Sequence, residues 1–284
     1  MALSINQNIA AFNAYRNLSV TQGDLSKSLE KLSSGFRINR AADDAAGLAI
    51  SEGLRAQVGG LKQASRNAQD GVSVVQTAEG ALTESHAILQ RMRTLSVQAA
   101  NDGGLNTDAK KNIQSEIGEL KSELTRIADT TQYNGTKLLD GSYAGKFQVG
   151  ANVGEVITVT VNNGTAGTGL GAVGLGVNTV DVTTAAAGTA PSGADQAITA
   201  IDAAIKTVST VRADLGAKQN RFEHTIKNLN VAVENLSASE SRIRDTDMAA
   251  EMSKFTRAQI LSQAGTSMLA QANQIPQGVL SLLR

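Results

Sequence analysis

The stretch ADQAITAIDAAIKTVSTVRADLGAKQNRFEHTIKNLNVAVENLSASESRI, residues 194–243, decides the fold. From Ala194 to Ile243 a series of fifteen positions follows alternating steps of four and three residues, and twelve of them are apolar. This heptad pattern is typical of a long coiled-coil helix. Fifty residues at ~1.5 Å each predict a helix of about 75 Å, which buries its apolar stripe only if other helices run beside it.

Two upstream segments carry matching patterns. One repeats an apolar residue every seven positions, and the other uses steps of three and four. Their members are Leu54, Leu61, Ala68, Val75, Leu82 and Leu89 in the first, and Ile113, Ile117, Leu120, Leu124 and Ile127 in the second. NDGGLN (101–106) reads as the turn between two antiparallel helices, with Thr107 or Asp108 as the N-cap of the second. We therefore predict an elongated antiparallel helical bundle.

Both ends of the chain are also expected to be helical and apolar along one stripe. The last helix is expected to stop at Pro276, and the final residues NQIPQGVLSLLR place four large aliphatic side chains beside the chain end. Because burying one such side chain contributes ~1.5–3 kcal/mol, we expect these ends to pack against each other and against copies of the chain. Non-closing contacts of this kind build helical filaments. The assembly residues that we predict are Leu18, Leu25, Leu29, Leu32, Leu261, Met268, Ile275, Val279, Leu280, Leu282 and Leu283.

The middle of the chain has a different pattern. Asn134-Gly135 and Asp140-Gly141 favour hairpin turns, and KFQVG and VITVTV alternate as strands do, which predicts a small β-hairpin element within about 134–162. Residues 163–192 are mostly Gly, Thr, Ala and Val, which predicts a very short surface excursion. The expected fold is mainly α, a helical bundle or coiled coil formed by both ends of the chain with this minor β portion.

The composition argues against several functions. Lys plus Arg equals Asp plus Glu, 26 of each, so no net charge favours nucleic acid or an anionic membrane. The chain has no cysteine, and its two histidines, His86 and His224, lack metal-ligand spacing. Asp43-Asp44 reads as a helix cap rather than a catalytic carboxylate pair. We expect no catalytic, cofactor-binding or metal-binding residues, no membrane-spanning helix and no cleaved signal peptide.

Several long motifs resemble those of one family. LSSGFRINRAADDAAGLAIS (32–51), QASRNAQDGVSVVQTAEGAL (63–82), LQRMRTLSVQAAN (89–101), YNGTKLL (133–139), FQVGAN (147–152) and RAQILSQAGTSMLAQANQIPQGVLSLLR (257–284) are similar to segments of bacterial flagellin. The resemblance covers roughly 1–160 and 193–284. Phe36 departs from the pattern, since leucine is common there.

The resemblance implies a structural subunit that self-assembles into the extracellular flagellar filament used for motility. It implies export through the flagellar type III channel without a cleaved signal peptide. Residues 1–44 and 245–284 would form the inner core that lines the filament channel. Residues 45–162 and 193–244 would form the helical bundle around it, and 163–192 the variable excursion.

The resemblance also implies partners. These are further copies of the chain, a flagellin export chaperone, the filament cap, the hook-junction proteins, and two host proteins, the Toll-like flagellin receptor and the intracellular flagellin sensor. Arg91, Leu95 and Glu116 match the receptor-recognition pattern, and the terminal leucines match the sensor's. Two alternatives stay open: a hook–filament junction protein, and a soluble coiled-coil adaptor whose leucine-rich tail binds one partner.

Overall fold

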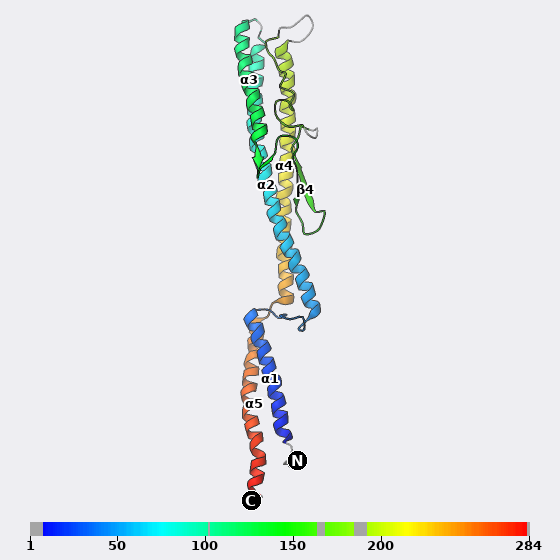
Figure 1. The fold of residues 1–284 in the computed structure, drawn as a ribbon, viewed down its shortest axis with the longest axis vertical. Coiled ribbons are helices and arrows are strands. Elements are labelled where there is room, and N and C mark those ends of the chain that lie inside the picture. Colours follow the sequence, from blue (N-terminus) through cyan, green and yellow to red (C-terminus); the bar gives the residue numbers. More distant parts are fainter. Residues whose placement is uncertain (1–7, 102, 164–167, 185–191, 283–284) are drawn as a thin grey trace. The chain divides into compact units, whose positions relative to one another are not determined.

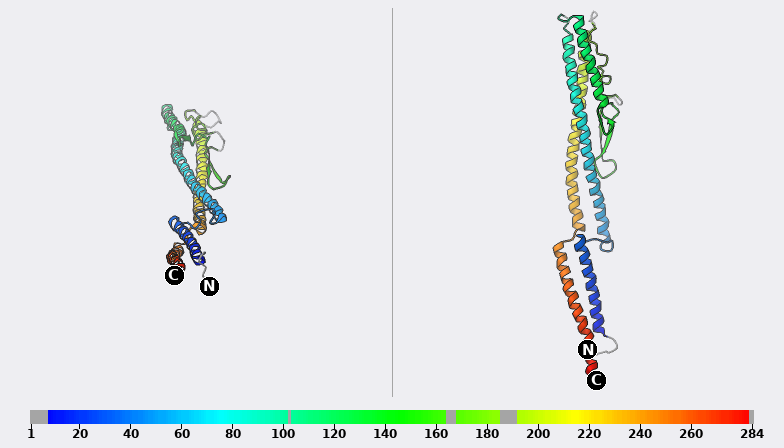
Figure 2. Two further views of the ribbon diagram at one scale, coloured as in Figure 1. Left: turned by 60° about the horizontal axis from the view of Figure 1, so that its bottom comes forward. Right: turned by 60° about the vertical axis from the view of Figure 1, so that its left-hand side comes forward.

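In a computed structural model of the chain, helices dominate (Figure 1), and Figure 2 shows the same elements from two further directions. The structure describes residues 8–101, 103–163, 168–184 and 192–282, and for residues 275–282 the backbone alone. The elements within these ranges are five helices, α1 (Ile9–Ser34), α2 (Ala45–Ala99), α3 (Thr107–Thr130), α4 (Gly193–Arg244) and α5 (Met248–Leu282), and two antiparallel strand pairs, β1 (Gln132–Tyr133) with β2 (Thr136–Lys137) and β3 (Ala144–Gln148) with β4 (Val156–Thr160). The prediction of a mainly α fold with a minor β portion is confirmed.

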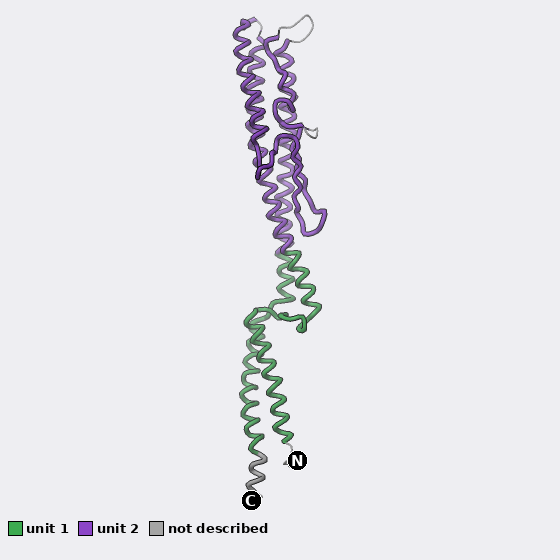
Figure 3. Tube along the Cα trace, in the orientation of Figure 1, with its two compact units in different colours: residues 1–58, 234–284 green, residues 59–233 purple. Residues whose placement is uncertain are grey.

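The chain divides into two compact units, each assembled from separate stretches of sequence (Figure 3). Unit 1 comprises residues 1–58 and 234–284, and unit 2 comprises residues 59–233. Helices α2 and α4 contribute residues to both units. The main hydrophobic core belongs to unit 2.

In unit 2, α3 and the second half of α2 run side by side with α4 (Figure 2). The turn between α2 and α3 lies where the sequence predicted it. The N-cap of α3 is Asn106, whose side-chain oxygen accepts a hydrogen bond of 2.8 Å from the backbone N–H of Ala109. The prediction of Thr107 or Asp108 was therefore wrong by one or two positions, because an asparagine amide satisfies the free N–H groups of the first turn equally well.

The heptad series of α4 supplies many of the side chains of this core. Six of its positions, spaced by seven, are buried: Ala194, Ile201, Val208, Leu215, Phe222 and Leu229. The intermediate positions Ile198, Ile205 and Ile226 are only half-buried, whereas Ala197, Ala204 and Val211 are buried instead. The buried stripe is thus rotated by one residue from the predicted one on that side, and small alanine side chains allow neighbouring elements a close approach.

Two hairpins follow α3. Asn134 and Gly135 both have positive φ, +48° and +77°, as the two central residues of a type I′ turn require, and they join β1 to β2. Phe147 on β3 meets Phe222 of α4 edge to face at 5.6 Å, and Val159 on β4 is fully buried. The predicted β element is confirmed.

The segment 168–184 forms no helix or strand, yet it packs against the helices of unit 2. The side chain of Gln114 on α3 donates to the carbonyl of Val180 (3.2 Å) and accepts from the backbone N–H of Val182 (2.9 Å). We expected a surface excursion over 163–192. The described part instead adds buried side chains to the core, because it carries apolar residues that an argument from glycine content overlooked; they are Leu170, Ala172, Leu175, Val177, Val180 and Val182.

Gly71 on α2 makes room for the aromatic ring of α4. A Cβ added at Gly71 would lie 2.6 Å from Cζ of Phe222. We predict that Gly71→Ala lowers the stability of unit 2 by about 1–3 kcal/mol through overpacking, although alanine is the better helix former. Gly80→Ala is the matched control, since nothing lies within 4 Å of its Cβ position, and it should stabilise the protein slightly. Urea unfolding followed by circular dichroism compares the two, and equal effects would contradict the packing argument.

Candidate assembly surface

Helices α1 and α5 of unit 1 form an antiparallel pair (Figure 3). Three contacts define its alignment. At one end the side-chain amide of Asn8 donates to the carbonyl of Ala272 (2.7 Å). In the middle the Cα of Gly265 packs against Leu18. At the other end the hydroxyl of Ser28 donates to a carboxylate oxygen of Glu251 (2.7 Å).

The residues between these two helices, which we call the α1–α5 seam, are mostly small or polar on the α5 side, and Phe255 and Leu269 are the exceptions. The burial pattern follows steps of three and four on both helices. The seam consists of Ala11, Ala14, Leu18, Thr21, Leu25, Ser28 and Leu32 on α1, and of Glu251, Phe255, Ala258, Ser262, Gly265, Leu269 and Ala272 on α5.

Six large apolar side chains of the pair are exposed outside the seam. Phe12 is 72% exposed, Ile260 64%, Met268 62% and Leu261 53%, and Tyr15 and Leu29 are exposed as well. We call these six the outer apolar residues. Leaving such a side chain in water forgoes ~1.5–3 kcal/mol of burial each, so the pair presents a surface that further contacts would stabilise.

The predicted assembly residues fall into three groups. Leu18, Leu25 and Leu32 are half-buried in the α1–α5 seam, whereas Leu29, Leu261 and Met268 are exposed. Ile275, Val279, Leu280 and Leu282 lie on the backbone of α5, but their side chains, like all of Leu283, are outside the described residues. The predicted stripe of α5 that contains Leu261 and Met268 is exposed in the single chain, and a second face of the helix packs against α1.

The end of α5 also differs from the prediction. The helix continues through Pro276 to Leu282 instead of stopping there. A proline removes one backbone donor and crowds the preceding turn, which costs about 3 kcal/mol in a helix interior but does not forbid continuation.

The sequence around this pair is short of charge. From Ala258 to Leu283 no residue is charged, and in α1 the only charged residue before Asp24 is Arg16. Charged side chains are the usual means of keeping an exposed helix face in water. Their scarcity, beside the outer apolar residues, favours a surface that becomes covered.

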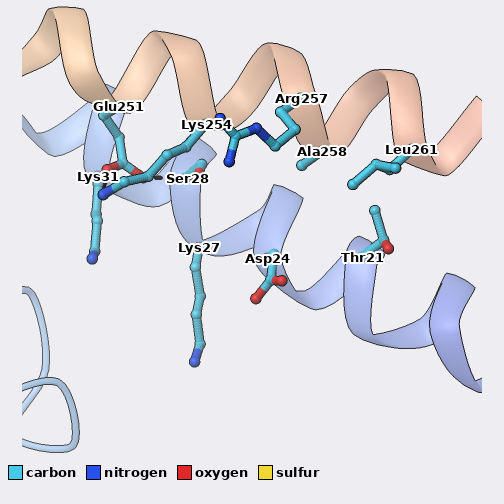
Figure 4. A pocket seen from close by; sticks show the side chains of 10 residues that line it. All are labelled: Thr21, Asp24, Lys27, Ser28, Lys31, Glu251, Lys254, Arg257, Ala258 and Leu261. Atoms are coloured by element: carbon cyan, nitrogen blue, oxygen red, sulfur yellow. Dashed lines mark hydrogen bonds and ion pairs between the residues drawn. The ribbon is translucent and has the colours of Figure 1, made fainter.

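A polar groove of about 310 Å³ lies where α1 and α5 meet near Glu251 (Figure 4). Burial raises the pKa of Glu251, but the hydroxyl of Ser28 and the ammonium group of Lys254, 3.1 Å away, outweigh it and lower the pKa below its usual value. The contact therefore contributes stability at neutral pH that is lost as the pH falls through the lowered pKa. The residues that line the groove are Thr21, Asp24, Lys27, Ser28, Lys31, Glu251, Lys254, Arg257, Ala258 and Leu261.

The residues predicted for receptor recognition lie in unit 2. Arg91 on α2 and Glu116 on α3 form an ion pair, with Nε and Nη2 of Arg91 donating to one carboxylate oxygen at 2.8 and 2.6 Å. Both side chains are about half exposed. Leu95 is different, because it is 2% exposed and belongs to the core. The structure thus brings Arg91 and Glu116 together on the surface and places Leu95 beneath it.

Asp43 and Asp44, considered above as a possible catalytic pair, have structural roles at the start of α2. The carboxylate of Asp44 accepts a hydrogen bond from the backbone N–H of Gly47 (2.8 Å) at the start of α2, so the cap prediction is confirmed. The backbone N–H groups of Arg40 and Asn39 bind the carboxylate of Asp43 and lower its pKa. In the described ranges no group of three or more His, Asp or Glu side chains could hold a metal ion.

None of the described helices combines the length and apolar character needed to cross a membrane.

Sequence patterns alone missed the pair Ser28–Glu251. The signal is nevertheless present, since Glu251, Ala258, Gly265 and Ala272 are spaced by seven. A search for large apolar residues overlooks a heptad of one acid and three small residues.

Paired terminal helices with a mostly small or polar α5 face in the seam and large apolar residues exposed outside it indicate a coiled-coil protein of the structural class. Comparison with known proteins makes this specific. The model of the bacterial flagellin N-terminal helical region matches residues 5–144, and that of the C-terminal helical region matches residues 198–283. The chain belongs to the bacterial flagellin family, whose members are structural rather than enzymatic.

Individual relatives agree over the full length. A flagellin of Halalkalibacterium halodurans is 53% identical over 284 residues, which cover 99% of each chain. A flagellin of Bacillus subtilis is 52% identical over 311 residues, covering 99% of this chain and all of the relative. A putative flagellar hook-associated protein from Vibrio parahaemolyticus has a TM-score of 0.59 at 13% identity, covering 72% of this chain and 100% of the other, which is a likeness of fold alone.

Proposed function

We propose that this chain is the subunit of a bacterial flagellar filament and that the helices α1 and α5 provide its central contacts between copies. The observation that supports this most is the arrangement of the pair. Its small residues are used within the molecule, while Ile260, Leu261 and Met268 are left for other copies. Full-length identity to flagellins supports the same function.

The roles that we propose for the segments of the chain follow the predicted domains. Residues 1–44 and 245–284 form the inner, channel-lining part of the filament, and 45–162 with 193–244 form the surrounding bundle. Residues 163–192 supply the short variable part. In this proposal the filament is extracellular, the chain is exported without cleavage, and its partners before and during assembly are the export chaperone, the cap and the hook-junction proteins.

Polymerisation is the direct test. Purified monomer is mixed with sheared filament fragments and salting-out ions, which strengthen apolar contacts, and growth is followed by light scattering and negative-stain microscopy. Long polymers are expected. A plateau at a few copies would indicate the hook–filament junction protein, and a defined small complex with another partner would indicate the adaptor.

We also propose that the monomer is recognised by the mammalian Toll-like flagellin receptor through the Arg91–Glu116 surface, with Leu95 supporting it from below. The half-exposed ion pair offers both charges to a partner. The terminal leucines are proposed as the element read by the intracellular sensor. In a polymer the Arg91–Glu116 surface would be covered by neighbouring copies, so intact filament should be the weaker ligand.

Removal of one charge tests the receptor proposal. Arg91→Ala is expected to raise the monomer concentration needed for receptor signalling by ~10-fold or more, as arginine anchors in interfaces do. An exposed ion pair contributes at most ~1 kcal/mol to stability, so the fold should survive. The measurement is a dose–response curve in reporter cells that express the receptor.

Arg126→Ala is the matched control for this experiment. Arg126 forms a similarly exposed ion pair with Glu123 on α3, at 2.6 Å, and takes part in neither hydrogen bond between Arg91 and Glu116. Equal potency of the two variants would remove Arg91 from the recognition surface.

A further inference from the structure

One carboxylate is buried in the α1–α5 seam. Glu251 is 5% exposed and Ser28 6%. The Ser28 hydroxyl holds one carboxylate oxygen at 2.7 Å, and Nζ of Lys254 holds the other at 3.1 Å (Figure 4). A buried charge is tolerated only where such partners are present.

The α5 residues that share the heptad positions of Glu251 constrain the alignment of the two helices only weakly. On the α5 side, Ala258, Gly265 and Ala272 follow Glu251 at intervals of seven. Side chains this small fit opposite almost any partner residue. At these positions a slide of α5 along α1 would replace one contact of a small residue by another at little cost, which is the situation in which coiled coils need a polar residue to fix the register.

We propose that Glu251 is the residue that selects the register of α5 on α1, because its buried carboxylate requires a hydrogen bond from the hydroxyl of Ser28. A slide of one helical turn would place the carboxylate opposite Leu25 or Leu32. Neither leucine can donate a hydrogen bond. The charge would then be buried without a partner, and the slide is excluded.

A slide of two turns is the harder case, because Thr21 then takes the place of Ser28 and also has a hydroxyl. The charges beside the two hydroxyls distinguish the native register from the slid one. Lys31 follows Ser28 by three residues and lowers the pKa of Glu251, whereas Asp24 follows Thr21 by three residues. The slid register would set a carboxylate beside a carboxylate, and like charges at this spacing repel.

The consequence concerns assembly and therefore rests on the proposed function. In a polymer of identical copies each α5 meets the α1 of neighbours as well as its own. Small-residue seams would permit exchange of helices between copies and pairing out of register. The hydrogen bond between Glu251 and Ser28 restricts α5 to one position on one α1. The outer apolar residues are then aligned for contact with the next copy.

Engineered disulfides can report the register, because the chain has no cysteine of its own. The native pair is Leu18→Cys with Gly265→Cys, since a Cβ built at Gly265 lies 3.7 Å from the Cβ of Leu18. That separation falls within the ~3.5–4.5 Å of disulfides. The slid pair is Ala11→Cys with Gly265→Cys, one heptad away on α1. Both are oxidised with copper–phenanthroline and resolved on non-reducing gels.

In the otherwise unchanged protein only the native pair is expected to cross-link within one chain. Adding Glu251→Leu should increase the slid disulfide, or disulfides between chains, by ~10-fold or more. Glu251→Gln, which keeps a hydrogen-bond acceptor, should give an intermediate increase. The swap Ser28→Glu with Glu251→Ser should restore the native register. Glu30→Leu, on α1 outside the seam, is the matched control and should change nothing.

The proposal is overturned if Glu251→Leu cross-links only in the native register, or if the swap leaves the slid disulfide as abundant as in Glu251→Leu. Cross-linking is measured on monomer and on sedimented polymer. Polymerisation is a separate readout. A protein that keeps its register through Glu251 but never forms long polymers would refute the filament function and leave the register assignment intact.

Discussion

Leu261→Asp is expected to abolish polymerisation while the isolated subunit keeps its helical content. The side chain is 53% exposed and lies at the edge of the α1–α5 groove near Thr21, so the change removes little contact within the chain. In the assembly it removes ~1.5–3 kcal/mol of burial and adds a charge to a covered surface. A combined loss of about 3 kcal/mol per added copy raises the critical monomer concentration by ~100-fold or more.

The measurement is seeded growth over a series of monomer concentrations, with sedimentation to find the concentration below which no polymer forms. Leu261→Met is the matched control, since it keeps an apolar side chain of similar volume and should polymerise as before. Circular dichroism shows whether the aspartate variant still folds. Unchanged growth of a folded Leu261→Asp chain would exclude this face of α5 from the contacts between copies.

The long helices were predictable because their signal is redundant. In α4 the apolar heptad pattern recurs over 50 residues, so a few polar members such as Arg212 and Gln219 do not obscure it. Turn chemistry was equally local, since Asn134-Gly135 has few alternatives to a tight hairpin turn. Both features depend on neighbours in sequence.

The face of α5 that packs on α1 was not predictable, because the decisive partner lies far away in sequence. Whether Leu261 faces α1 or solvent depends on residues more than 200 positions earlier, and the helix itself carries two usable faces. Ala258 and Gly265 lie on the face of α5 that packs against α1, because their small side chains permit close approach of the two backbones. Hydrophobicity alone would have chosen the leucine.

The candidate receptor surface shows the same limit. Arg91 and Leu95 were grouped because both match the receptor-recognition pattern that the resemblance implies, and residues four apart are neighbours on a helix surface. Their environments differ nonetheless, since Arg91 pairs with Glu116 of α3 at the surface whereas Leu95 belongs to the core. Spacing along a helix predicts proximity, but burial depends on where the partner helix sits.

Phe222→Ala should cause the largest loss of stability in unit 2. The ring is fully buried, lies over Gly71 and meets the edge of Phe147. Truncation leaves a cavity where α2, α4 and β3 converge and should cost ~3–5 kcal/mol. For a unit of this size that corresponds to a fall in melting temperature of about 6–20 °C, measurable by calorimetry. Phe12→Ala is the matched control, since that ring is 72% exposed and should change the unfolding of unit 2 very little.

A double-mutant cycle then separates packing from other causes. If Phe222 and Gly71 compete for one space, Phe222→Leu should relieve the clash of Gly71→Ala, so that the pair is more stable than the sum of the single changes by ~0.5–3 kcal/mol. Additive effects would mean that the two positions do not interact and that the cost of Gly71→Ala arises within α2. The cycle therefore tests whether one glycine holds the aromatic contact on which the β3–β4 hairpin and both long helices converge.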